Sequence, residues 1–121
     1  MKIAICAQTN DVQAAVDSRF GRAAFFAVYD DAAQTWEFIP NRQNLQAAQG
    51  AGLQSAQLLV DADIQVLLAC NVGPKAMAAL TGSGIRVFQA ARGQTLQQAL
   101  AAYQSNKLTA VDQATVNGHW V

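Results

Sequence analysis

The sequence of 121 residues has few of the side chains from which catalytic and metal sites are usually built. It contains two cysteines and one histidine, too few for a zinc finger or for a framework of several disulfides. The histidine, His119, lies in a C-terminal stretch without a clear pattern, so a catalytic set that pairs serine or cysteine with histidine cannot be assembled. The residues therefore give no positive sign of an enzyme, and we expect none.

The sequence also has no excess of charge of either sign and no long apolar run. Eight basic and eight acidic residues give a formal net charge of zero, which argues against nucleic acid or an acidic membrane surface as a partner. No apolar run reaches the roughly 18 residues of a membrane span, and the N-terminal apolar stretch is too short for a signal peptide. We expect a cytoplasmic monomer whose single domain covers residues 1–121.

The spacing of apolar residues predicts alternating strands and helices. Continuous or alternating apolar runs predict strands at residues 2–6, 23–30, 35–40, 64–70 and 85–89. Apolar residues at helical spacing predict helices from Gly50 to about residues 61–63, from Pro74 to about Leu80, and after Thr95, where Gln98 completes a capping box. The loop of residues 7–22 is expected to hold a helical turn around 12–16, and residues 106–121 are expected to be a weakly structured tail beyond an ordered core of about 1–105.

This order of elements predicts an α/β fold of three layers. Counting strands along the chain, we expect a five-stranded mixed sheet of order 3-2-1-4-5 with strand 2 antiparallel and three helices packed on it. The ends of strands 1, 3, 4 and 5 then share one edge of the sheet with the beginnings of the helices. In open α/β sheets ligands bind at such an edge, where the strand order reverses.

Basic residues are predicted to gather at this edge. They are Arg19, Arg22, Arg42, Lys75 and Arg92. The turns at the opposite end carry Asp30, Asp31, Asp61 and Asp63. Each arginine alone is most simply a solvated surface side chain, but together with the three helix N-termini they favour a site for an anion.

The two cysteines follow adjacent parallel strands in this topology. Cys6 ends the first strand and Cys70, in the stretch "ACNVGPKA", ends the fourth. Each could be an ordinary small apolar residue of the core. A disulfide between them is disfavoured in the cytosol, and the third alternative is a thiol that binds or borders a soft metal or a metal-sulfur cluster.

Three segments carry a family resemblance: "SRFGRAAFF", "GAGLQSAQLL", and "GPKAMAAL" followed by "SGIRVF". In this order and spacing they resemble the dinitrogenase iron-molybdenum cofactor biosynthesis family, which includes NifX and the C-terminal part of NifB. The resemblance implies a ribonuclease H-like fold and a role in carrying or assembling metal-sulfur clusters. Among the members, the short orange proteins, which hold a molybdenum-copper sulfide cluster, are more similar to this chain than the nitrogenase proteins are.

One position departs from the family pattern. Gln49 stands where many relatives have a histidine, so a histidine ligand at that place is excluded. A cluster that brings its own sulfides needs mainly a basic surface lined by amide groups, for which glycines allow close approach. The predicted binding residues are Arg19, Phe20, Gly21, Arg22, Asn44, Gln49, Gly50, Gly52, Asn71, Gly73, Pro74 and Arg92, with Cys6 and Cys70 as metal ligands.

These observations lead to two hypotheses of different classes. The first is a non-catalytic carrier of an anionic metal-sulfide cluster, either a molybdenum-copper sulfide cluster or a precursor of the iron-molybdenum cofactor. Its partners would be the proteins that donate and accept the cluster, including ATPases encoded nearby. The alternative is a regulatory or scaffold module without a cofactor that binds a protein partner through the same basic face.

Overall fold

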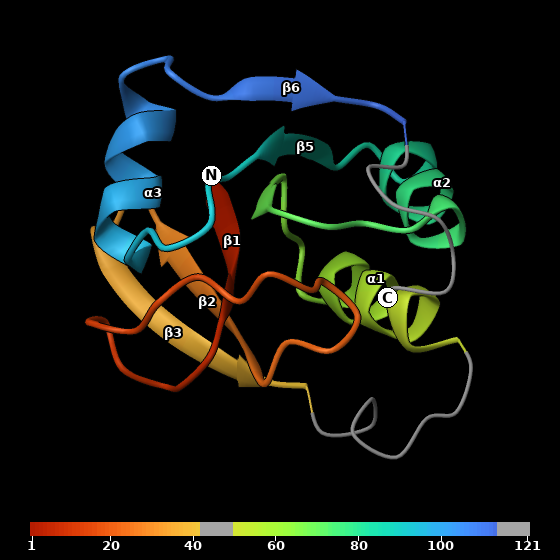
Figure 1. Ribbon diagram of the computed structural model, residues 1–121, viewed down its shortest axis with the longest axis horizontal. Helices are drawn as coiled ribbons and strands as arrows, with labels where there is room; N and C mark the ends of the chain where they lie inside the picture. The colour runs from red at the N-terminus through yellow and green to blue at the C-terminus, as the bar shows by residue number, and fades with distance from the viewer. Residues whose placement is uncertain (42–49, 114–121) are drawn as a thin grey trace.

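The computed structural model describes residues 1–41 and 50–113 (Figure 1). The strands are β1 (Lys2–Ala7), β2 (Phe25–Asp30), β3 (Thr35–Pro40), β4 (Val66–Ala69), β5 (Arg86–Gln89) and β6 (Thr109–Val111). The helices are α1 (Ala51–Asp61), α2 (Pro74–Gly82) and α3 (Leu96–Gln104). Among the described helices none has both the length and the apolar character needed to cross a bilayer.

The described strands form one mixed sheet in the order β3-β2-β1-β4-β5-β6. β2 is antiparallel to both β1 and β3, whereas β4 is parallel to β1 and β5 is parallel to β4. The predicted order and the predicted directions of the first five strands are therefore confirmed. The prediction of five strands is wrong, because residues 109–111, assigned to a weakly structured tail, pair antiparallel with β5.

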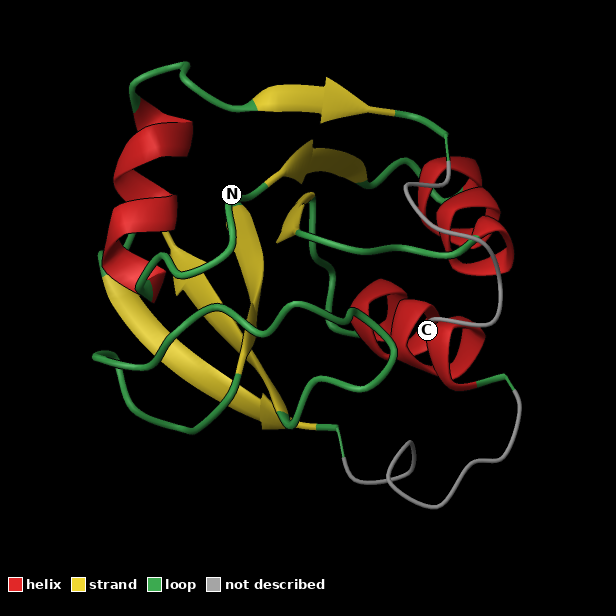
Figure 2. Ribbon diagram, viewed as in Figure 1, coloured by secondary structure: helices red, strands yellow, loops and turns green. Residues whose placement is uncertain are grey.

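Helices cover both faces of the sheet, so the domain has three layers (Figure 2). Under α1 and α2 lies one buried cluster, which includes Cys6, Phe26 and Leu67 from the sheet. Under α3 lies a second, which includes Ile5, Leu68 and Cys70. Because neighbouring residues of a strand point to opposite faces, the continuous apolar runs of β1 and β4 fill both clusters.

Local signals explain most of the element boundaries. Thr95 and Gln98 form the predicted capping box, each side chain accepting a backbone N–H from the other residue, and α1 and α2 begin where glycine and proline indicated. The predicted helical turn at 12–16 is wrong at its C-terminal side. Val16 instead forms an isolated antiparallel bridge with Ala7 at the end of β1, and Ala15 forms one with Thr95. The backbone here is therefore extended because it pairs with these two distant segments.

Candidate functional site

The carboxyl ends of β1, β3, β4 and β5 meet at one edge of the sheet, as the strand directions require. Three loops cross this edge: residues 8–24, 70–73 and 90–95. We call these loops, together with the first turns of α1 and α2, the rim. Long-range bridges hold the loops to one another, pairing Ala15 with Thr95 and Arg19 with Asn71. The rim is therefore a connected surface built from distant parts of the sequence.

The loop of residues 8–24 is fixed to the ends of β1 and β4 by backbone hydrogen bonds. The Asp17 N–H donates to the Cys6 carbonyl oxygen at 2.8 Å. The Asn71 N–H donates to the Ser18 carbonyl at 3.1 Å, and the Phe20 N–H donates to the Asn71 carbonyl at 3.1 Å. Between these two bonds the backbone of Arg19 is held in place while its side chain is exposed. The predicted residues Arg19 and Asn71 are thus brought together.

Two helices begin at the rim with glycine at the N-cap position. Gly50 precedes α1 in a left-handed conformation with φ 76°, and Gly73 precedes α2, whose first residue is Pro74. Glycine has no side chain that could accept the N–H groups of the first turn, so these groups are left to other acceptors. Amide groups and the positive end of a helix dipole together suit a negatively charged ligand.

Gly21 and Gly52 bring the loop of residues 8–24 into close contact with the first turn of α1. A Cβ atom on Gly21 would lie 2.8 Å from the Gly52 nitrogen and 3.0 Å from its Cα. Both contacts are with backbone atoms, which cannot swing aside as a flexible side chain can. Glycine at position 21 is therefore required by the close approach of two backbone segments. The family resemblance included this glycine in a motif but did not give this reason for it.

A buried polar pair links the end of β3 to α1 beneath the rim. Asn41 and Ser55 are both fully buried. The Asn41 Nδ2 donates to the Ala23 carbonyl at 2.9 Å, and the Ser55 hydroxyl donates to Asn41 Oδ1 at 3.2 Å. Buried amide groups are costly unless they are hydrogen-bonded, so this pair fixes α1 against the loop of residues 8–24. Neither residue was among the predicted site residues, because nothing in the local pattern marks them as buried.

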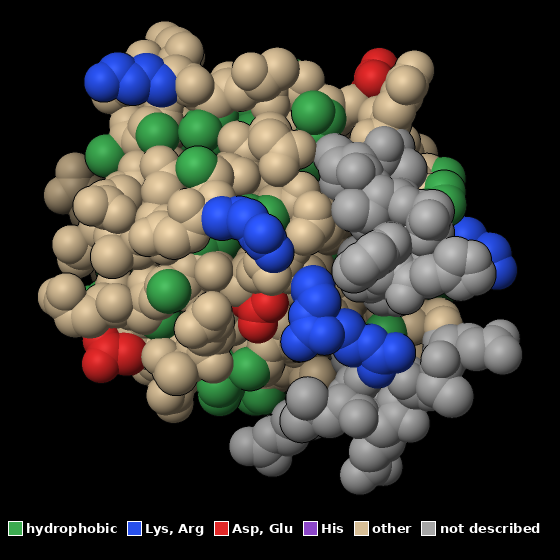
Figure 3. Space-filling view, viewed as in Figure 1, with side chains coloured by type: hydrophobic (Ala, Val, Ile, Leu, Met, Phe, Trp, Pro, Cys, Tyr) green, Lys and Arg blue, Asp and Glu red, His purple; other side chains and the backbone are tan. Residues whose placement is uncertain are grey.

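Basic side chains are spread over the rim. Arg19, Lys75 and Arg92 are exposed and Arg22 is half-buried. In Figure 3 lysine and arginine side chains gather in the middle of the face seen in Figure 1, with acidic atoms beside them. At the other end of the sheet Asp31 forms an ion pair of 2.9 Å with the N-terminal amino group. The rim is nevertheless not purely basic, because the loop of residues 8–24 also carries Asp11 and Asp17.

The two thiols end neighbouring strands but face opposite layers. Cys6 belongs to the cluster under α1 and α2, whereas Cys70 belongs to the cluster under α3. Both cysteines are buried, as expected for apolar core residues, and neither forms a disulfide. Burial raises the pKa of the Cys6 thiol well above its ordinary value, and the charge of Asp17 adds to this effect. Burial also raises the pKa of Cys70, which the guanidinium of Arg92 partly opposes.

These environments predict unreactive thiols. Near pH 8 we expect iodoacetamide to alkylate the folded protein at least about tenfold more slowly than the unfolded protein, because thiolate is the nucleophile. As the pH rises above the ordinary thiol pKa of 9.0, the free energy of unfolding should fall. The reason is that unfolded thiols ionise there while the folded ones stay protonated. Denaturant titrations across this range measure the slope, and the Cys6→Ala variant should flatten it. Equal alkylation rates in both states would contradict the assignment.

Some predicted residues take other places than expected. Phe20, expected as an apolar wall of the site, is fully buried, with its ring centroid 5.4 Å from that of Phe26. It therefore supports the rim from beneath and is not exposed to a ligand. Asn44, Gln49 and the basic residue Arg42 lie outside the described residues. Within residues 1–41 and 50–113, no three His, Cys, Asp or Glu side chains are grouped so that they could hold a metal ion.

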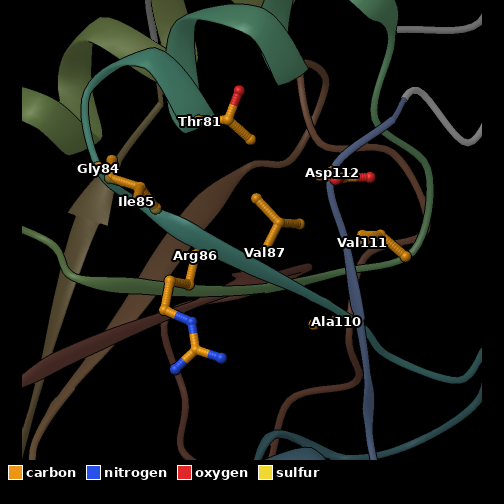
Figure 4. A pocket seen from close by; sticks show the side chains of 8 residues that line it. All are labelled: Thr81, Gly84, Ile85, Arg86, Val87, Ala110, Val111 and Asp112. Carbon is orange, nitrogen blue, oxygen red and sulfur yellow. The ribbon is translucent and has the colours of Figure 1, made fainter.

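A hollow of about 380 Å³ lies away from the rim, at the amino end of β5 (Figure 4). Its lining comes from the end of α2, from β5 and from β6, and includes Thr81, Arg86 and Asp112. Because β6 runs antiparallel to β5, Asp112 reaches the end of the sheet opposite to Cys70 and Arg92. The hollow therefore shares no residue with the predicted site.

Comparisons with known proteins agree with this arrangement. The family model described as dinitrogenase iron-molybdenum cofactor matches residues 1–106. The apo form of the orange protein from Desulfovibrio gigas is 36% identical, with a TM-score of 0.92 over 95% of this chain and 96% of that chain. A putative NifB protein from Thermotoga is 31% identical, with a TM-score of 0.83 over 97% of this chain and 98% of that one. Among curated protein sequences none is significantly similar.

Proposed function

The chain belongs to the dinitrogenase iron-molybdenum cofactor family, and from this premise we propose that it is a non-catalytic carrier that holds an anionic metal-sulfide cluster on the rim. The observation that supports this most is the meeting of exposed Arg19 and Arg92 with two glycine-capped helix N-termini at one edge of the sheet. The layer order is compatible with the ribonuclease H-like class implied by the resemblance, and that assignment stays a prediction.

The donor groups of the rim fit a cargo better than a resident metal ion. A metal ion held by the protein alone needs several side-chain ligands, and no such group occurs among the described residues. A cluster that carries its own sulfides requires instead counter-charge and hydrogen-bond donors, which guanidinium groups and backbone amide N–H groups supply. We propose that the cluster is bound mainly by these contacts. Cys6 and Cys70, predicted as metal ligands, are buried on opposite faces of the sheet, so in this proposal they belong to the core below the rim.

The cargo we propose is a molybdenum-copper sulfide cluster. A precursor of the iron-molybdenum cofactor, which is also an anionic metal-sulfide cluster, is the alternative cargo. The 36% identity to the orange protein supports the first, and the family description supports the second. In either case donor and acceptor proteins, including ATPases encoded nearby, would deliver and remove the cluster, and the carrier would act as a cytoplasmic monomer.

Reconstitution tests the proposal directly. The purified protein is mixed with tetrathiomolybdate and a copper(I) salt and is then passed through a desalting column. We expect a visible charge-transfer absorption and a fixed ratio of molybdenum and copper to protein in the protein fraction. The variant with Arg19→Glu and Arg92→Glu, treated in the same way, controls for unspecific retention. Loss of both metals on the column would argue for the cofactor-free scaffold instead.

A further inference from the structure

Two acidic residues, Asp11 and Asp17, occur in the rim, and they differ in their hydrogen bonds to the sheet. Each carboxylate accepts a backbone N–H two residues later, from Gln13 at 2.8 Å and from Arg19 at 3.0 Å. Asp17 in addition donates its own N–H to the Cys6 carbonyl at 2.8 Å. Its carboxylate is therefore fixed between the end of β1 and the backbone of Arg19.

The charge of Asp17 acts on the floor of the rim. The Asp17 N–H is hydrogen-bonded to Cys6 at the end of β1, and Asp17 is half-buried whereas Asp11 is exposed. The next residue, Ser18, accepts the N–H of Asn71 just after β4, so the charge of Asp17 lies near the ends of both strands. Arg92, in the loop that follows β5, carries the opposite charge. An anion resting above the ends of β1 and β4 would therefore be attracted by the arginine and repelled by the carboxylate.

We propose that Asp17 weakens the hold of the rim on its anionic cargo, so that the cargo is bound reversibly and can be passed on. This inference rests on the proposed function, and it adds a residue that sets affinity and release. A carrier built only of positive groups would bind a multiply charged anion tightly and give it up slowly. A fixed negative charge makes the free energy of binding less favourable in proportion to the charge of the anion.

The test compares Asp17→Asn with Asp30→Asn. The Asp30 carboxylate accepts the Ala32 N–H at 3.0 Å, in a turn at the opposite end of the sheet from the rim. Asparagine keeps an oxygen that can accept the N–H of Arg19 or Ala32, so each variant removes one charge and retains its turn. For a carboxylate about 6 Å from the anion we expect Asp17→Asn to raise the affinity for the dianion tetrathiomolybdate about tenfold, mainly by slowing dissociation. For the monoanion perrhenate the gain should be only about threefold, because the free energy scales with charge. Asp30→Asn should change the affinity for either anion by less than about twofold, because it lies at the far end of the sheet.

The outcomes separate this inference from the proposed function. If the unaltered protein retains tetrathiomolybdate but Asp17→Asn behaves like Asp30→Asn, the role of Asp17 is wrong and the carrier function stands. If tetrathiomolybdate is not retained but molybdate and perrhenate bind with the expected gain in Asp17→Asn, the anion-tuning role stands and the carrier function is wrong. A gain that is equal for monoanion and dianion would overturn the electrostatic explanation, and binding of none of these anions would overturn both.

Discussion

Replacing Arg19 and Arg92 together by glutamate is expected to lower the affinity for tetrathiomolybdate about a hundredfold. Both side chains are exposed on the rim, and each replacement turns an attractive charge into a repulsive one. Facing a dianion at about 8 Å in a water-like medium with salt, each reversal costs about 1–2 kcal/mol. Two reversals cost about 3 kcal/mol, which corresponds to two orders of magnitude in the dissociation constant. Spectroscopic titration of both proteins with tetrathiomolybdate at fixed ionic strength measures the two dissociation constants.

A matched pair of reversals away from the rim controls for net charge. Arg86 begins β5 at the opposite end of the sheet and Lys107 follows α3, and both are exposed. The variant with Arg86→Glu and Lys107→Glu has the same net charge as the rim variant, so we expect its affinity to stay within about threefold of the unaltered protein. Equal losses in the two double variants would mean that net charge, and not the rim, governs binding. Thermal unfolding of each variant shows whether the fold is retained.

The parts of the fold that were predictable from sequence have local signals. The first five strands and the three helices follow from apolar runs, helical spacing and the Thr95–Gln98 capping box, which all depend on near neighbours. Strand directions followed from the connections, since crossover helices require parallel strands. This is why the meeting of Cys6, Asn71 and the helix N-termini at one edge could be expected.

The parts that were not predictable depend on distant contacts. β6 has only three residues, too few for a period of two to be recognised, and it forms because Val111 pairs with Val87 at the edge of β5. The bridge between Arg19 and Asn71 and the buried pair of Asn41 and Ser55 join segments that the sequence separates. The burial of Phe20 has the same origin, because the loop that carries it is pressed onto the core by these contacts.

Substituting Gly21 should disturb both stability and binding, because the backbone of α1 lies against it. In Gly21→Ala the new Cβ would approach the Gly52 nitrogen to 2.8 Å and the Ala51 carbonyl carbon to 3.2 Å. Overpacking of this kind costs about 1–3 kcal/mol, and Gly21→Val should lie at or above the upper end because its branched side chain adds two methyl groups. Denaturant unfolding monitored by circular dichroism gives the change in the free energy of unfolding.

Gly82 offers a matched control for the same chemical change. It is the last residue of α2, and a Cβ on it meets nothing within 4 Å, so Gly82→Ala should leave the free energy of unfolding unchanged or raise it by up to about 0.5 kcal/mol. If the contact between Gly21 and Gly52 also holds the first turn of α1 toward the cargo, Gly21→Ala should weaken tetrathiomolybdate binding under conditions where it is still folded, while Gly82→Ala should not. A Gly21→Ala protein as stable as Gly82→Ala would show that the loop can move away from α1, and the rim would then not be a rigid surface for the cargo.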